Sequence, residues 1–304
     1  MIDRLCAGFE AAPGTSPETQ LTECLARLDR FLRDRDLDRG MVLRQTCFVR
    51  ADEEFSIDSL RSRLRPVLND FFTGAPPPAV FVGQPPAGGA RIALEAWCVS
   101  LPSPARIYDT LADDVPYRIL EENGGREIYA AAASSPSGRD PRERAEDVFR
   151  KITAVLKAEG IGFSDVVRQW NYIEGIVGFS SHGKNPRQNY QIFNDVRTRA
   201  YGPSGFIDGY PAATGIGMDR GGIVIECLAV KPGPRDIRIL SLSNPRQTDA
   251  HRYSQQVLKG KALSGMEKKG TPKFERAKLL SVGNRALIFL NVACSMSPVR
   301  SIPS

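Results

Sequence analysis

The stretch VRQWNYIE, at residues 167–174, decides the fold of this chain, because LRQTCFVR at residues 43–50 repeats its pattern. A second pair of segments repeats with it: IVIECLAVK at residues 223–231 lies over IALEAWCVS at residues 92–100. Their apolar residues alternate or run on continuously, as they do in half-buried and central β-strands. An internal repeat indicates the architecture before any single motif does. The sequence therefore predicts two copies of one unit.

Both copies predict the same order of elements, which is helix, strand, helix, strand and strand. The elements fall at residues 22–34, 41–50, 56–72, 79–86 and 91–100 in the first copy, and at 142–160, 165–176, 188–201, 210–219 and 221–230 in the second. Mostly antiparallel connections, with helices packed on one face of a sheet, make this an α+β plan.

The chain also contains the beginning of a third copy. A hairpin at residues 126–138 precedes the long helix of the second copy, and KFERAKLLSVGNRALIFLNVA at residues 273–293 resembles another such opening. We expect an N-terminal unit at 1–120, a central unit at 121–235, and a connecting segment with a truncated third unit at 236–304. Residues 101–125 read as a linker between the copies. An incomplete third unit leaves an open sheet edge, so we expect some self-association.

The composition argues against several classes of protein. No run approaches the roughly 18 to 20 consecutive apolar residues of a membrane-spanning helix, and no apolar signal core opens the sequence. The expected location is cytoplasmic. Six scattered cysteines and two histidines give no pattern for a metal site or a disulfide framework. The net charge of +6 is spread along the chain, so we expect no nucleic-acid partner, and a mildly basic surface suits a small anionic substrate.

Specific motifs then carry a family resemblance. The block from Ser135 to Val230 resembles a unit of the Rid family of enamine/imine deaminases, with a glycine that ends the long helix in KAEGIGFSDVV, the strand VRQWNYIE and the last strand IVIECLAV. More specifically, RQWNYI, FNDVR, YPAATGIG and PKFERAKLL together are similar to the chorismatases, whose fold is built from Rid-like parts. The resemblance is weak before residue 120.

The resemblance implies tandem Rid-like α+β units in a pseudo-trimeric arrangement, with an incomplete third unit. It implies an enzyme that cleaves the enol-pyruvyl ether of chorismate to pyruvate and a hydroxybenzoate or dihydroxycyclohexadiene carboxylate, with no cofactor. Such cleavage requires protonation of the methylene carbon and no covalent nucleophile. This suits a chain whose only histidines are His182 and His251, since a Ser-His-Asp arrangement has few places to form.

Two departures from these families keep other functions open. Rid deaminases bind their substrate's carboxylate with an arginine where this chain has the segment 211–214, PAAT, so a Rid-like enamine/imine deaminase is an alternative that lacks its usual anchor. The tail LNVACSMSPVRSIPS, from residue 290 onward, differs from the glycine-rich continuation expected of chorismatases. An inactive or ligand-binding remnant is therefore a further alternative.

Two glutamates are candidates for the catalytic acid. A carboxylic acid in an apolar pocket stays protonated closer to neutral pH, because desolvation raises its pKa. Glu226 lies mid-strand among apolar residues, and Glu275 lies in the PKFERAK motif. The alternative for Glu226 is the solvent face of the strand or an inter-subunit salt bridge, and for Glu275 it is an exposed strand position.

Five residues are candidates for binding the dicarboxylate substrate. Arg197 follows Asn194 by three residues on a helix, so the two share a face and together suit a carboxylate. Arg276 follows Glu275 on an alternating strand, so its side chain points to the opposite face, and it is a candidate for binding the second carboxylate. Tyr210 and Thr214 bracket YPAATGIG, whose small residues let a ligand approach the backbone. The alternatives are a helix-surface ion pair for Arg197 and tight sheet packing for YPAATGIG.

Overall fold

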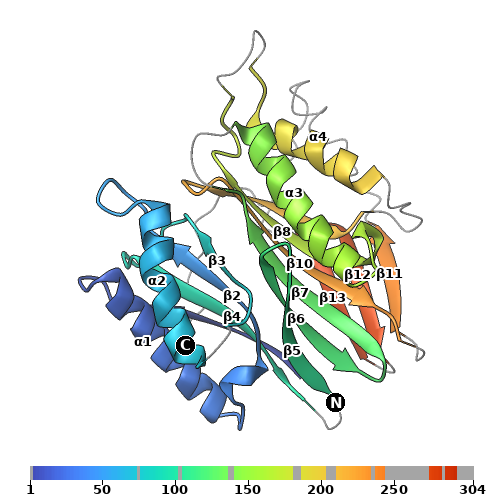
Figure 1. The fold of residues 1–304 in the computed structure, drawn as a ribbon, viewed down its shortest axis with the longest axis horizontal. Coiled ribbons are helices and arrows are strands. Elements are labelled where there is room, and N and C mark those ends of the chain that lie inside the picture. The colour runs from blue at the N-terminus through green and yellow to red at the C-terminus, as the bar shows by residue number, and fades with distance from the viewer. Residues whose placement is uncertain are drawn as a thin grey trace.

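The computed structural model describes residues 3–73, 76–101, 105–135, 140–180, 186–202, 210–233, 237–243, 274–282 and 285–292. These residues form two α+β units and a further small sheet (Figure 1). The α+β class and the tandem repeat predicted from the sequence are confirmed. None of the helices in this part of the chain is long and apolar enough to span a membrane.

Unit 1 is a four-stranded sheet covered by two helices on one face. The strands lie in the order β1-β4-β2-β3, with bounds β1 Asp3–Glu10, β2 Val42–Val49, β3 Ala79–Val82 and β4 Ile92–Ser100. Helix α1 (Pro17–Arg33) begins after Ser16 and helix α2 (Ile57–Phe72) after Ser56; each serine side chain accepts a backbone N–H three residues on, as an N-cap does. The buried face of α2 consists of leucines spaced four residues apart, Leu60, Leu64 and Leu68.

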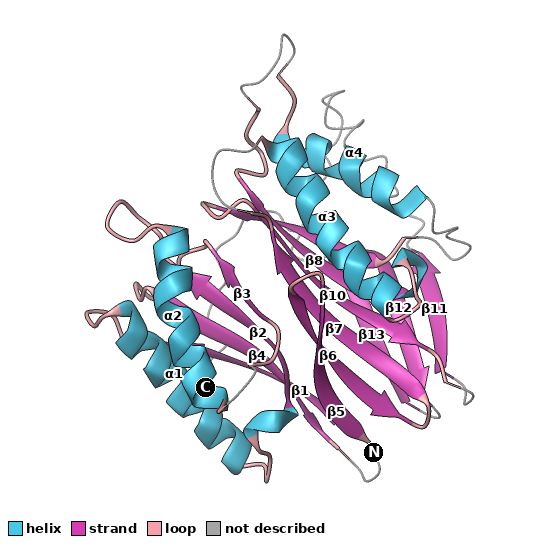
Figure 2. Ribbon diagram, in the orientation of Figure 1, coloured by secondary structure: helices cyan, strands magenta, loops and turns pink. Residues whose placement is uncertain are grey.

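Unit 2 repeats this plan in a larger, six-stranded sheet. Its strands lie in the order β5-β6-β7-β10-β8-β9, with bounds β5 Arg106–Ala112, β6 Val115–Glu122, β7 Gly125–Ala133, β8 Val166–Glu174, β9 Ala212–Met218 and β10 Ile223–Lys231. Helices α3 (Pro141–Ala158) and α4 (Asn189–Tyr201) cover one face of the sheet (Figure 2). As in unit 1, a parallel pair, here β8 and β9, is joined to an antiparallel neighbour, here β10.

The interpretation of residues 101–125 as a linker is wrong. Strands β5 and β6 form a hairpin there and extend the sheet of unit 2, across the boundary predicted at residues 120/121. Asp113 and Asp114 both adopt positive φ angles, 48° and 61°, and Asn123 and Gly124 at the next turn do so as well. Paired positive φ angles suit tight two-residue hairpins, and Asp and Asn tolerate them, so short turns join strands where the composition resembles a loop.

The two sheets pack against each other with their helices on the outside. One apolar cluster contains Leu43 and Val99 of unit 1 together with Leu120, Val167 and Leu228 of unit 2. A separate core lies between each sheet and its own helices. Every residue of β8 and β10 therefore faces either the helices of unit 2, which we call the helix side, or the sheet of unit 1, which we call the inter-sheet side.

The third sheet contains strands β11 (Ile237–Ser243), β12 (Phe274–Val282) and β13 (Arg285–Val292) in antiparallel order. The hairpin of β12 and β13 falls on the segment predicted to open a third unit. Strand β13 lies beside β9. The third sheet thus adjoins the edge of unit 2 that contains YPAATGIG.

Candidate functional site: two polar layers on one sheet

Glu226 forms a buried ion pair between the two units. It is fully buried on the inter-sheet side of β10, where Oε1 lies 2.7 Å from Nη1 of Arg44 in unit 1. The hydroxyl of Thr46 donates to the same oxygen at 2.8 Å, and the hydroxyl of Tyr172 donates to Oε2 at 3.3 Å. Burial raises the pKa of Glu226, and the Arg44 guanidinium offsets part of that shift. The alternatives for this residue were the solvent face and an inter-subunit salt bridge; the structure has instead a salt bridge within the chain, between its two units.

Arg44 is stacked against both tryptophans of the chain. Its guanidinium carbon lies 4.6 Å from the ring centroid of Trp97 and 4.3 Å from that of Trp170. Its Nη2 also reaches Oε1 of Glu95 at 3.0 Å. Arg168, at the position of β8 equivalent to Arg44, lies 4.8 Å from the Trp170 centroid. Cations placed over indole rings are attracted by the ring's negative face, so these contacts order the inter-sheet side.

A second set of buried polar residues lies on the helix side of the same sheet. We call it the α4 polar layer, and it consists of Gln169, Asn171, Asn194, Arg197 and Tyr201. The Tyr201 hydroxyl donates to Oε1 of Gln169 at 2.8 Å, and Nε2 of Gln169 donates to Oδ1 of Asn171 at 2.5 Å. Burial raises the pKa of Tyr201, and the nearby Arg197 offsets part of that shift.

Asn194 and Arg197 have unused hydrogen-bonding groups. They are only 5% and 4% exposed. Both amide atoms of Asn194, and Nε and Nη2 of Arg197, have no hydrogen-bond partner among the residues that the structure describes. Nε and Nη2 form the edge of the guanidinium that binds a carboxylate through two parallel hydrogen bonds. Because buried hydrogen-bond donors without acceptors are costly, this arrangement indicates a site for an anionic ligand.

The equivalent layer of unit 1 is mostly apolar, so the polar residues are not a requirement of the fold. The strand registers place Cys47 where unit 2 has Asn171, and Phe81 where it has Gly215. The buried residues of α2 are all leucines, whereas those of α4 include Gln191, Asn194 and Arg197. Only Gln45 matches Gln169, and its buried amide has no hydrogen-bond partner within the described residues.

The sheet of unit 2 divides the predicted site residues into two groups. Asn194, Arg197 and Tyr210 lie together on the helix side, with the Arg197 guanidinium carbon 5.9 Å from the centroid of the Tyr210 ring. Thr214 and Glu226 lie on the inter-sheet side, where the Thr214 hydroxyl accepts from Nη2 of Arg168 at 2.6 Å. Glu275 and Arg276 belong to β12, and their side chains lie outside the described part of the structure.

Sequence reasoning missed several members of these two layers. Arg44, Gln169, Asn171 and Tyr201 are all buried polar residues that it did not single out. The available signal was the repeat, because LRQ and VRQ place Arg44 over Arg168 in two strands that are otherwise apolar. A buried polar group needs a partner, so a polar residue in a central strand deserves a search for one.

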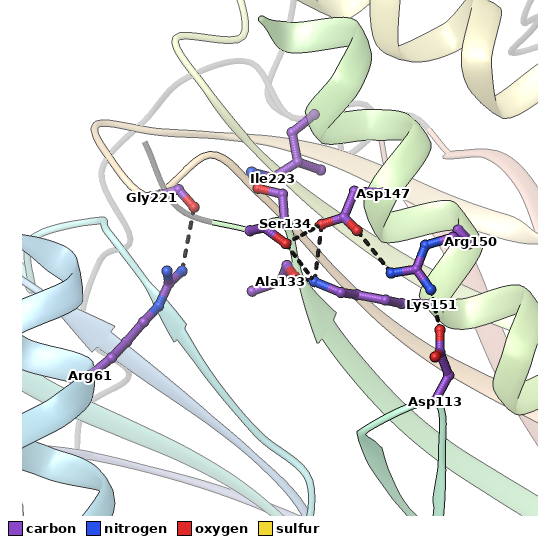
Figure 3. Close-up of polar contacts among 10 residues, drawn as sticks. Arg61, Asp113, Ala133, Ser134, Asp147, Arg150, Lys151, Gly221 and Ile223 are labelled. Atoms are coloured by element: carbon purple, nitrogen blue, oxygen red, sulfur yellow. Dashed lines mark hydrogen bonds and ion pairs between the residues drawn. The ribbon is translucent and has the colours of Figure 1, made fainter. Parts of the chain in front are cut away.

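Another polar cluster joins Asp147 and Lys151 of α3 to Ser135, which lies just after β7. Figure 3 shows Asp147 and Lys151 beside the contact between Arg61 of unit 1 and the Gly221 carbonyl. Lys151 lies 3.3 Å from the hydroxyl of Ser135 and 3.0 Å from Asp147. Burial would raise the pKa of Asp147, but hydrogen bonds from Ser135 and Lys151 bring it well below its usual value. Lys151 also donates to the Ala133 carbonyl at 2.8 Å, so this cluster ties α3 to the end of β7.

A cavity of about 450 Å³ lies where unit 1 meets β6, and its arginines are already paired. Arg39 binds Asp29 at 2.7 Å, and Arg118 binds Asp109 through two nitrogens at 2.7 Å each. Within the described residues, no group of three or more His, Cys, Asp or Glu side chains is arranged to hold a metal ion. The unused groups of Asn194 and Arg197 therefore remain the best candidate for a ligand site.

Residues 114–229 match the family model of the FkbO/Hyg5-like chorismatase N-terminal domain. The central part of this chain is therefore similar to the N-terminal domain of chorismatases. A 3-hydroxybenzoate synthase of Streptomyces hygroscopicus is 31% identical over 136 residues, which are 44% of this chain and 37% of that protein. A chorismatase of Streptomyces rapamycinicus is 34% identical over 96 residues, or 31% of this chain and 27% of that protein. The alignments thus span about a third of these chorismatases.

A solved structure extends the likeness to nearly the whole fold. A crystal structure of a chorismatase aligns with 95% of this chain and 68% of its own, with a TM-score of 0.56 and 17% identity. At this level of identity the match concerns the fold alone. The chorismatase relationship predicted from RQWNYI, FNDVR and YPAATGIG is confirmed.

Proposed function

We propose that this chain is a chorismatase-like enzyme, which cleaves the enol-pyruvyl ether of chorismate to pyruvate and a hydroxybenzoate or dihydroxycyclohexadiene carboxylate. The family match and the names of the relatives support this activity over the enamine/imine deaminase and the inactive remnant. One observation of the structure carries the proposal: a buried arginine edge with no partner among the described residues suits a carboxylate, and chorismate has two. The small-molecule substrate is part of this proposal.

The α4 polar layer supplies the proposed substrate contacts. Arg197 binds one carboxylate through Nε and Nη2, and Asn194 exchanges hydrogen bonds with the same group or a neighbouring hydroxyl. The ring of Tyr210, close to Arg197, limits the space beside the carboxylate. Residues of this kind hold the substrate in one orientation in a water-poor site. They thereby accelerate a reaction whose chemical step is a proton transfer.

Of the two predicted acids, we assign the chemical step to Glu275. Glu226 is fully buried, pairs with Arg44 and lies across the sheet from Arg197, so we assign it to the interface between the units. Protonation of the methylene carbon by Glu275 generates an oxocarbenium-like centre, which water or an internal rearrangement then resolves. Arg276, next in sequence, is proposed as the anchor of the second carboxylate. The predicted self-association remains a prediction.

The experiment is a lactate-dehydrogenase-coupled assay of pyruvate release from chorismate, with an enzyme-free blank for spontaneous decay. Arg197→Gln is compared with Arg199→Gln, a matched control on the same helix whose side chain is 59% exposed. We expect release well above the blank for the wild type and the control, and a loss of at least about 10²-fold in kcat/KM for Arg197→Gln. No release by the wild type, or full activity of Arg197→Gln, would refute the proposal.

A further inference from the structure

A continuous network connects unit 1 to the α4 polar layer of unit 2. On the inter-sheet side it begins with Arg44, which pairs with Glu226 and stacks on Trp170. Arg168 stacks on the same indole ring. Two arginines therefore depend on the position of one tryptophan, and the first of them comes from the other unit.

The network then crosses the sheet at Thr214. On the inter-sheet side the Thr214 hydroxyl accepts from Arg168 at 2.6 Å. On the helix side the Thr214 carbonyl accepts from Nδ2 of Asn171 at 3.2 Å. If Arg168 moves and β9 shifts with it, the Thr214 carbonyl that accepts the hydrogen bond from Asn171 must therefore move as well. This links the two faces through one residue of YPAATGIG.

On the helix side the network ends at α4. Asn171 accepts from Gln169, and Gln169 accepts from the hydroxyl of Tyr201. Tyr201 follows Arg197 by one helical turn, and its ring lies 5.2 Å from that of Tyr210, which is itself close to Arg197. Buried hydrogen-bonded groups of this kind rigidify one another.

We propose that Arg44 is a positioning residue for the Arg197 site, acting through Trp170, Arg168 and Thr214. Unit 1 is then part of the machinery that positions the ligand site, although its own copy of the layer is mostly apolar. The proposal rests on the proposed function only in taking Arg197 as a carboxylate anchor. It requires the planar guanidinium of Arg44, because a lysine keeps the charge beside Glu226 but cannot stack its face against two indoles.

The chain offers a matched control at the same interface. Arg4 of β1 pairs with Glu127 of β7, so this ion pair also joins the two units. The Tyr129 hydroxyl donates to Glu127 at 2.6 Å. Among the contacts of the described residues, this group shares no hydrogen bond or ring contact with Trp170, Arg168 or Thr214. Arg4→Met therefore weakens the interface without removing a hydrogen bond or ring contact of the network.

The first experiment measures binding of 3-hydroxybenzoate by calorimetry to the full-length chain and its variants. We expect Arg44→Met to bind about 3- to 30-fold more weakly than the wild type, the range found for residues that act on a site indirectly, and Arg4→Met to bind normally. Arg44→Lys is expected to recover thermal stability relative to Arg44→Met but not affinity. Equal losses in Arg4→Met and Arg44→Met, or full rescue of affinity by lysine, would overturn the proposal.

The second experiment needs no ligand, so it separates this proposal from the proposed function. Trp97 and Trp170 are the only two tryptophans, and both contact Arg44, so intrinsic fluorescence reports on the stack. Tyr201→Phe removes a hydroxyl on the helix side, across the sheet from both indoles. We expect it to shift the tryptophan emission, as Thr214→Val does, while Arg199→Gln does not. Unchanged emission in Tyr201→Phe would overturn the network, whatever the assay for pyruvate shows.

Discussion

Replacement of Arg197 by methionine removes a buried charge whose Nε and Nη2 have no partner among the described residues. Methionine fills a similar elongated space and adapts its shape to its neighbours. The buried unpaired donors cost about 1 to 3 kcal/mol, and more for a charged group. We therefore expect Arg197→Met to be more stable than the wild type by about 1 to 3 kcal/mol while it loses the proposed carboxylate site.

Thermal and urea unfolding of the ligand-free protein measure this gain. At about 2 °C per kcal/mol for a chain of this size, the melting temperature is expected to rise by about 2 to 6 °C. Arg199→Met, at an exposed position of the same helix, is expected to change stability by less than about 0.5 kcal/mol. A rise in both variants would point to a general preference for methionine in this helix.

Arg44→Met is the comparison in which a paired buried arginine is removed, because Arg44 is 3% exposed and paired with Glu226. Breaking a buried ion pair by removing one partner costs about 3 to 5 kcal/mol. If Arg197→Met loses stability to a similar degree, Arg197 is a paired structural residue. The reasoning that makes it an anionic-ligand site then fails.

Two further predictions concern stability. Hydrogen bonds from Ser135 and Lys151 lower the folded-state pKa of Asp147, so the stabilisation by its carboxylate is present above the unfolded pKa of about 4 and is lost as the pH falls further. Asp147→Asn should therefore lower the free energy of unfolding by about 2 kcal/mol at pH 7. In urea titrations the difference in stability between wild type and variant should narrow below about pH 4, and a difference independent of pH would contradict the assignment to the ionised carboxylate. Gly83→Ala should cost about 1 to 3 kcal/mol, because its Cβ would collide with the carbonyl oxygen of Arg220; an unchanged melting temperature would show that the inter-unit contact can yield.

The amino-acid sequence by itself determined the repeated helices and strands of the two copies, the α+β class and the similarity to the chorismatases. Local signals were sufficient for this, because helical spacing of leucines in α2 and apolar runs in β8 and β10 are properties of short segments. The same local logic placed Asn194 and Arg197 on one helix face, where the structure has them. It failed for β5 and β6, because the positive φ angles of Asp113 and Asp114 turn a polar, loop-like stretch into a tight hairpin.

Only the tertiary structure decided what the buried polar residues meet. Alternation showed that Glu226 points to one face of its strand, but not that this face meets Arg44, which lies in the other unit. Nor did the sequence show that the sheet places Thr214 and Glu226 on one side and Arg197 on the other, because side-chain direction becomes a location only when the packing of the sheets is known. Partners distant in the sequence are set by how the faces of two units come together, and that is determined by the fold as a whole.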